Sequence, residues 1–259
     1  MAIGSRAPFL CAALLAGCGS EQDLVIGSND WVQVRHDDFD ALDLEFWERA
    51  THTFDQNQAW FTEQNAQVEQ GELVLTITKQ ATPAAPAAGE TPKPYAAAEL
   101  RSRPLFLYGR FRTRVRLAPG VGIITSFWGF YDHYAINAPD SDDQIVIEAA
   151  NAPEHLLRFF VVVPQRDTQP ALRSLDFDPS LSSHELGFDW TPTEVRFYLD
   201  GVLQSTVTGD ATAGLSQYQR LVLSAYPSQA EWTGTFDDSV LPVAARFDWV
   251  DIYQYAGRR

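Results

Sequence analysis

The sequence is short of positive charge, of cysteine and of long apolar runs. Its 259 residues include 19 basic against 34 acidic ones, which gives a net charge of −15. A surface of this sign repels a phosphate backbone, and that excludes nucleic-acid binding. The only cysteines, Cys11 and Cys18, lie close to the N-terminus. Because they cannot form a disulfide within the rest of the chain, the fold must depend on core packing, for which an apolar fraction of 45% is sufficient.

The N-terminus carries an apolar run that is too short for a membrane helix. It extends from Ala7 to Ala16 after the positive side chain of Arg6, whereas a spanning helix needs about 20 residues. Small residues follow the run, which is the layout of a secretory signal. The stretch Leu15-Ala16-Gly17-Cys18 also resembles a bacterial lipobox, in which the cysteine becomes the lipidated first residue. An ordinary signal peptide that happens to contain Cys18 is the alternative.

This signal predicts how the chain is divided. Residues 1–17 form a lipoprotein signal peptide, 18–30 a short polar tether and 31–259 one folded domain. The lipid on Cys18 is then the only contact with a membrane. Gly19 is not an acidic retention signal, so the sequence predicts an exported protein anchored in the bacterial cell envelope, at the outer membrane.

Beyond the tether, short runs with period-two alternation dominate, and they are broken by Gly, Pro, Asn and Asp. The clearest runs are 72–78, 110–117 and 194–199. Asp200-Gly201 follows the last run and is typical of a two-residue hairpin turn. The Ala- and Pro-rich stretch 81–94 is predicted to be a surface loop. With no helical period and no repeat, the pattern predicts one all-β domain, an antiparallel jelly-roll sandwich of two sheets.

The segment 142–149 is the first candidate for chemistry. Alternation places Ile145 and Ile147 on one face, toward the core, and Gln144, Val146 and Glu148 on the other. A carboxylate beside a valine on one strand face indicates a cleft. The alternative is an edge strand on which Glu148 meets only solvent.

The order of several motifs resembles the family 16 glycoside hydrolases, especially the lichenase and laminarinase-like β-glucanases. The segment 142–149 aligns with the Glu-Ile-Asp-Ile-Glu active-site strand of that family. Successive blocks before and after it also resemble the family, over nearly all of the chain from Trp31 to Tyr255: 51–57, 71–76, 98–103, 107–111, 122–128, 186–192, 197–202, 231–234 and 247–250. The resemblance implies the concanavalin A-like lectin and glucanase type of jelly roll.

The catalytic positions implied by the resemblance are only partly filled. Gln144 stands at the nucleophile position, Val146 at the position of the assisting Asp, and Glu148 at the acid/base position. Retaining hydrolases place their two carboxyl groups roughly 5–5.5 Å apart. An amide is a very poor nucleophile, and loss of such a group costs about 5–8 kcal/mol of transition-state stabilisation. We therefore expect no hydrolysis by the usual retaining mechanism.

Other acidic residues do not obviously replace the nucleophile. Asp142 shares the face of Glu148 but lies six residues away, roughly 20 Å along an extended strand. Asp132 with His133 could supply a base for an inverting mechanism, which stays open as an alternative. Because Gln144 and Val146 remove two negative neighbours, we expect Glu148 to ionise more readily than in active relatives unless burial opposes this.

The resemblance also assigns binding positions. Aromatic platforms for sugar rings are expected at Trp128, Phe130, Tyr226 and Trp232. Polar sugar contacts are expected at Asn57, Glu99 and Arg101. Phe160 and Ser224 depart from the family, because related lichenases carry Asn there. For each aromatic residue, a place in the core or at the rim is the alternative.

A structural Ca²⁺ site is implied at Asp248, with the carbonyl of Gly71 as a second ligand. A plain surface aspartate at a strand end is the alternative, and the reaction itself requires no cofactor.

Two functions therefore compete. One is a non-catalytic, glycan-recognising surface lipoprotein that binds a polysaccharide or oligosaccharide. The other is an atypical endo-β-glucanase or transglycosylase that uses Glu148 on β-1,3/β-1,4-glucan or a related polysaccharide. A cleft that binds a protein of the envelope is a third, weaker option.

Overall fold

The computed structural model describes residues 30–82, 91–132, 142–151, 154–164, 166 and 168–256. Strands dominate these residues, which confirms the predicted all-β class. Their bounds are β1 (Trp31–Asp37), β2 (Trp47–Arg49), β3 (Ala59–Phe61), β4 (Ala66–Glu69), β5 (Glu72–Ile77), β6 (Tyr95–Ser102), β7 (Gly109–Arg116), β8 (Ile123–Phe130), β9 (Gln144–Ala150), β10 (Leu156–Val162), β11 (Ala171–Ser174), β12 (His184–Trp190), β13 (Glu194–Leu199), β14 (Val202–Thr208), β15 (Arg220–Pro227) and β16 (Val243–Tyr255). The helical turns are short: η2 (Glu63–Asn65), α1 (Asp210–Ala213), η3 (Glu231–Thr233) and η4 (Asp238–Val240).

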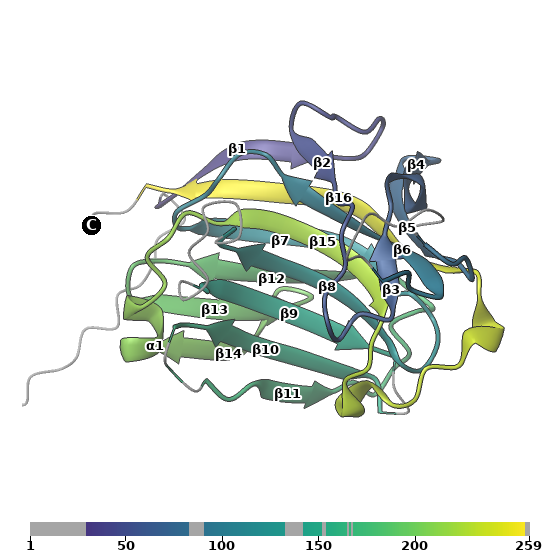
Figure 1. The fold of residues 1–259 in the computed structure, drawn as a ribbon. Coiled ribbons are helices and arrows are strands. Elements are labelled where there is room, and N and C mark those ends of the chain that lie inside the picture. Colours follow the sequence, from purple (N-terminus) through teal and green to yellow (C-terminus); the bar gives the residue numbers. More distant parts are fainter. Residues whose placement is uncertain are drawn as a thin grey trace, which may run out of the picture.

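The strands form two stacked sheets, which Figure 1 shows as two layers. One sheet has the order β14-β13-β12-β7-β16-β5-β4, with β1 added beside β16. The other has the order β11-β10-β9-β8-β15-β6-β2, with β3 beside β6. The pairing is antiparallel except between β3 and β6, which run parallel. The predicted antiparallel sandwich is therefore confirmed, with this one short exception.

The alternation along each strand explains why the sheets stack. In β7, Phe111, Thr113 and Val115 are buried while the arginines between them are partly or fully exposed. In β9, Ile145 and Ile147 are fully buried and face the other sheet. The core lies between the two layers, and the opposite face of β9 is left for other contacts.

The turn predicted at Asp200-Gly201 joins β13 to β14. Leu199 pairs with Val202, and the two central residues have φ values of 48° and 73°. Gly201 takes this left-handed conformation without strain, and Asp is among the residues that tolerate it best. Residues 1–29 and 83–90 lie outside the described residues, and these contain the predicted signal, most of the tether and most of the loop 81–94. Within the described ranges, no helix has the length and apolarity that a membrane crossing requires.

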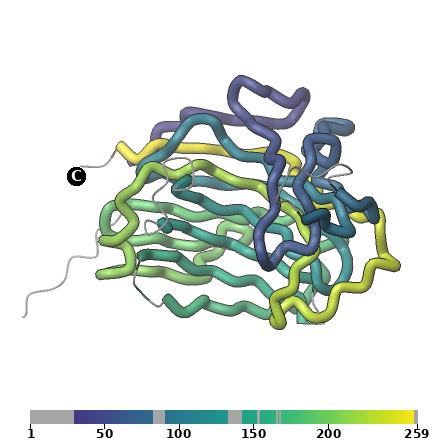
Figure 2. The backbone as a smooth tube through the Cα atoms, in the orientation of Figure 1, coloured from purple at the N-terminus to yellow at the C-terminus, as the bar shows by residue number. Residues whose placement is uncertain are grey.

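A long connection between β2 and β3 reaches across the sheet that contains β9. Ala50 N donates to the carbonyl of Glu99 in β6, and Gln58 N donates to that of Pro227 at the end of β15. Figure 2 shows this segment, in purple and blue, crossing the strands of that sheet. The crossing places residues 52–56 over the strands and builds one wall of a cleft.

Phe188 should be among the side chains on which the stability of the sandwich depends most. It is 1% exposed on β12, its ring lies 4.8 Å from that of Phe111, and it lies 5.7 Å from that of Phe127 in the opposite sheet. We expect Phe188→Ala to lower the free energy of unfolding by about 3–5 kcal/mol, because it removes contacts and leaves a cavity. Urea unfolding measures this. Leu181→Ala, at an exposed leucine, should change the same quantity by less than about 0.5 kcal/mol; equal losses for both variants would contradict the assignment of the core.

Candidate functional site

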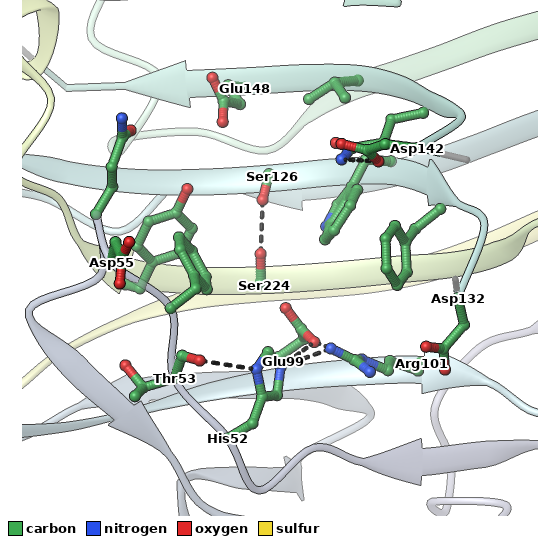
Figure 3. A pocket seen from close by; sticks show the side chains of 17 residues that line it. His52, Thr53, Asp55, Glu99, Arg101, Ser126, Asp132, Asp142, Glu148 and Ser224 are labelled. Atoms are coloured by element: carbon green, nitrogen blue, oxygen red, sulfur yellow. Dashed lines mark hydrogen bonds and ion pairs between the residues drawn. The ribbon is translucent and has the colours of Figure 1, made fainter. Parts of the chain in front are cut away.

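A cavity of ≈ 710 Å³ lies on the face of β9 that points away from the core. Its lining comes from β6, β8, β9 and β15 and from the crossing segment 52–56, and Figure 3 shows it at close range. Gln144, Val146 and Glu148 all line it, as the alternation predicted. Because β9 is paired with β8 on one side and β10 on the other, it is not an edge strand. The alternative in which Glu148 meets only solvent is therefore wrong.

The register of the strands arranges the side chains on this face of the sheet in two rows, of which all members except Arg158, Phe160 and Val222 line the cavity. The acid row consists of the residues opposite one another at the level of Glu148: Arg158, Glu148, Ser126, Ser224 and Glu99. The apolar row lies two residues along each strand: Phe160, Val146, Trp128 and Val222, ending at Arg101. The cleft thus has polar groups along one row and a mainly apolar surface along the next.

Glu148 is the carboxylic acid next to Arg158 in the acid row. Burial raises its pKa to about 7, while the cation of Arg158 and a hydrogen bond from the Tyr226 hydroxyl oppose the rise. The Arg158 guanidinium is only loosely engaged, with its Nη1 3.4 Å from Glu148 Oε2. Burial therefore opposes the easier ionisation expected from the loss of two negative neighbours, and the pKa of Glu148 lies above its ordinary value.

Glu99 stands at the opposite wall of the cavity, as Figure 3 shows. Burial by itself would raise its pKa, but the charge of Arg101 and the contact with His52 hold it below the ordinary value. Arg101 Nε donates to Glu99 Oε1 at 2.6 Å, and His52 Nε2 lies 3.0 Å from the same oxygen. Between the two walls, the hydroxyls of Ser126 and Ser224 share a hydrogen bond of 2.6 Å.

His52 is a cavity residue that the sequence analysis missed, and so are Phe54 and Asp55. All three lie in the block 51–57, which resembles the family, but no residue pattern there indicates a shared wall. Hydrogen bonds that tie the crossing segment to β6 and β15, together with the packing of Phe54 on Tyr226, bring them to the cleft.

The nucleophile position is occupied by a fixed amide. Gln144 Nε2 donates to Asp142 Oδ1 at 2.7 Å, and both residues line the cavity. Asp132 also lines it, with an oxygen 3.5 Å from Arg220 Nε. His133, the other residue proposed for an inverting mechanism, lies outside the described residues.

The predicted binding residues divide into two groups. Trp128, Phe130, Tyr226, Glu99 and Arg101 all line the cavity. Asn57 and Trp232 are not part of that lining. Asn57 is fully buried, and its Oδ1 accepts a hydrogen bond from Ala59 N, so it supports the crossing segment. The face of Trp232 is occupied by Arg158, whose guanidinium carbon lies 4.7 Å from the ring centroid.

At the predicted calcium site, the carboxylate of Asp248 lies beside the guanidinium of Arg114. An oxygen of Asp248 lies 3.4 Å from Arg114 Nε, and Gly71 sits in the turn between β4 and β5 with a φ of 78°. Among the described residues, no three His, Cys, Asp or Glu side chains gather where they could hold a metal ion. A site that combines Asp248 with backbone carbonyls stays a prediction, and Arg114 would have to move aside for it.

A jelly-roll sandwich whose concave sheet carries a cleft with aromatic rings and carboxylates is the architecture of β-sandwich carbohydrate-active proteins. The model of the family "Glycosyl hydrolases family 16" matches residues 53–250. The chain belongs to this family, and the resemblance inferred from the motifs is confirmed.

Individual relatives agree with this assignment. A β-glucanase of Brevibacillus brevis is 28% identical over 221 residues, which cover 83% of this chain and 80% of that protein. A β-glucanase of Acetivibrio thermocellus is also 28% identical, but the match spans only 61% of its length. Among solved structures, a lichenase from a mouse hindgut metagenome superposes with a TM-score of 0.73 at 25% identity, over 85% of this chain and 98% of that one. The laminarinase catalytic domain of Thermotoga petrophila, at 20% identity and a TM-score of 0.78 over 88% and 99% of the two chains, shares the fold.

The burial of Glu148 predicts a measurable dependence of stability on pH. Its pKa is about 7 in the folded chain against an ordinary value of 4.5, so the folded state binds the proton more tightly. Stability is therefore lost as pH rises from about 4.5 to about 7, by about 3 kcal/mol. Glu148→Gln removes this loss. Relative to the natural sequence, the variant should gain about 3 kcal/mol in the free energy of unfolding between pH 4 and pH 8. Urea unfolding at both pH values tests this, with Glu63→Gln, at an exposed glutamate, as control; a constant difference for Glu148→Gln would contradict the raised pKa.

Proposed function

We propose that the cleft binds a β-linked polysaccharide of the β-glucan class and does not hydrolyse β-glucan. The size of the cavity, its aromatic lining at Trp128, Phe130 and Tyr226, and the fixed pair Glu99–Arg101 support sugar binding. Aromatic ring faces stack on sugar rings whether or not a catalytic group is present. The β-glucanases among the relatives support the class of polysaccharide.

The observation that carries the second half of the proposal is the chemistry at the nucleophile position. Active relatives are expected to use a carboxylate there, assisted by an Asp two residues later. This chain has the amide of Gln144, engaged with Asp142, and the buried side chain of Val146. Neither group offsets the positive charge of an oxocarbenium-like transition state. Binding of β-glucan without hydrolysis through an enzyme nucleophile is the function these residues support best.

A second candidate function rests on Glu148. Because burial raises its pKa to about 7, the carboxyl is protonated in a large share of molecules at neutral pH, as a general acid must be. An atypical endo-β-glucanase or transglycosylase that uses Glu148 is therefore the alternative. A glycan array run beside a reducing-sugar assay on the same β-glucans separates the two, since binding without release of reducing ends supports the first. Hydrolysis by the natural sequence that Glu148→Gln abolishes would establish the second.

The proposed loss of catalysis should be partly reversible. Gln144→Glu with Val146→Asp returns both missing carboxylates to the face that carries Glu148. Recovery of even about 4 kcal/mol of transition-state stabilisation would raise the rate of β-glucan hydrolysis roughly a thousandfold. Release of reducing sugar from mixed-linkage β-glucan and from laminarin measures this, with Gln144→Asn/Val146→Ile as a matched double variant that should stay inert. If the restored pair is inert and no β-glucan binds, the glucan assignment fails.

We also propose that the domain is displayed on the cell envelope by a lipid on Cys18, as the lipobox-like sequence indicates. In a bacterial host, an alkyne fatty acid should label the chain, and Cys18→Ser should abolish the label. Cys11→Ser is the matched control, because Cys11 lies within the segment removed on maturation and its loss should leave labelling unchanged. Label that persists in Cys18→Ser would rule the anchor out.

A further inference from the structure

We infer that the part of the cleft between Gln144 and Glu148 accepts a 2-acetamido sugar, whose own amide oxygen supplies the nucleophile that the chain lacks. The inference rests on the proposed polysaccharide-binding function and goes beyond the β-glucan class by assigning a 2-acetamido sugar to this subsite. It also explains together why Gln144 replaces the nucleophile and why Val146 replaces the assisting Asp, which otherwise are two independent losses of a carboxylate. Four features of the cleft carry it: the orientation of Gln144, the apolar floor at Val146, the space between Gln144 and Glu148, and Glu148 itself.

Gln144 presents an acceptor to the cleft. Its Nε2 is committed to Asp142 at 2.7 Å, and among the described residues no donor reaches its Oε1. Donation to a carboxylate polarises the amide and strengthens its oxygen as an acceptor. An acetamido group offers one N–H donor, which matches a single fixed acceptor. A carboxylate at the same position would instead attack the sugar itself.

Val146 and Trp128 provide an apolar surface beside that acceptor. The two residues are directly opposite each other on β9 and β8, and Phe160 on β10 continues the same row. Val146 is 3% exposed and still lines the cavity. The 2-hydroxyl of a glucose unit gains nothing from such a surface, whereas the methyl of an acetamido group is stabilised by leaving water. An Asp at position 146 would make this contact unfavourable.

Space for the 2-acetamido group exists because the side chain of Gln144 is held toward Asp142. Asp142 precedes Gln144 and therefore lies on the side away from Glu148. The hydrogen bond keeps the amide at that end of the cleft. Gln144 and Glu148 are four residues apart on one face, roughly 13 Å between Cα atoms in an extended strand. The interval between their side chains has Val146 as its floor, and the substituent of the sugar is placed there.

The reaction balances with Glu148 as the only protein acid and base. The acetamido carbonyl oxygen attacks C1, the bond from C1 to the glycosidic oxygen breaks, and Glu148 gives its proton to the departing oxygen. The resulting five-membered oxazolinium ion keeps its N–H, which donates to Gln144 Oε1. A water molecule then gives a proton to the Glu148 carboxylate and attacks C1, which reopens the ring. One water is consumed, and the configuration at C1 is retained. Arg158, 3.4 Å from Glu148 Oε2, stabilises the carboxylate between the two steps.

Two tetrasaccharides that differ only at C2 test the binding part. Tetra-N-acetylchitotetraose carries 2-acetamido groups where cellotetraose carries hydroxyls. In calorimetric titrations we expect the acetylated chain to bind about tenfold more tightly, from one hydrogen bond and one buried methyl at the single subsite between Gln144 and Glu148. Gln144→Leu should remove most of this preference, whereas Gln67→Leu, at an exposed glutamine outside the cavity, should retain it. Circular dichroism spectra confirm that the variants are folded.

Hydrolysis and a stable mimic of the intermediate test the mechanism. Release of shorter oligosaccharides from the acetylated chain is expected for the natural sequence. Glu148→Gln should slow it by about 10²–10⁴-fold and leave binding in place. N-acetylglucosamine-thiazoline, a mimic of the oxazoline, should inhibit the reaction, and Gln144→Leu should weaken that inhibition.

The outcomes separate this inference from the proposed function. If β-glucan binds and the acetylated chain binds no better than cellotetraose, the inference is overturned and the proposed function stands. If the acetylated chain is preferred but is not cleaved and the thiazoline does not bind, the catalytic step is overturned. If neither β-glucan nor either tetrasaccharide binds, both the inference and the proposed function fail.

Discussion

The site depends on the central position of β9 in its sheet. One face of the strand places Ile145 and Ile147 in the core, and the other places Gln144, Val146 and Glu148 in the cleft. Backbone pairing with β8 and β10 fixes the register, so a slip by one residue would put the isoleucines in the cleft and the glutamate in the core. The packing of the two sheets therefore also determines which side chains meet the ligand. The same pairing brings Arg158, Ser126 and Trp128 beside these residues.

Two glutamates in this cleft respond in opposite ways to the loss of water: Glu99 is 1% exposed, and the side chain of Glu148 is 16% exposed. Glu99 has the guanidinium of Arg101 at 2.6 Å and His52 at 3.0 Å, and these contacts lower its pKa despite complete burial. Glu148 has Arg158 at 3.4 Å and the Tyr226 hydroxyl, which reduce the rise but do not cancel it. The difference lies in the distance to the guanidinium, because a desolvated carboxylate is stabilised only by close and well-directed partners. One wall of the cleft thus carries a fixed ion pair and the other a group that changes its protonation near neutral pH.

The family scaffold is kept while its chemistry is altered at specific points. The aromatic rings at Trp128, Phe130 and Tyr226 still line the cavity, but Arg158 stacks on one face of Trp232. Stacking of a cation on an indole competes with stacking of a sugar on the same face. Ser224 stands where related lichenases carry Asn, and its hydroxyl shares a hydrogen bond with that of Ser126 between the two walls. Arg158 on β10 and Ser224 on β15 belong to one sheet, with β9 and β8 between them, whereas Trp232 lies in η3.

The sequence by itself determined the all-β class, the two-sheet sandwich and the hairpin at Asp200-Gly201, because period-two alternation and turn chemistry act over a few neighbouring residues. It also determined the family, and it assigned Gln144, Val146 and Glu148 to one face. It did not determine the ionisation of Glu148, the wall formed by His52, or the loss of Asn57 and Trp232 from the cavity lining. Those features depend on residues far apart in the chain: the surroundings of Glu148, which include Arg158 and Tyr226, the hydrogen bonds that the crossing segment donates to β6 and β15, and the stacking of Arg158 on Trp232. Local patterns set which way a side chain points, whereas its solvation and its partners are set only when distant segments pack together.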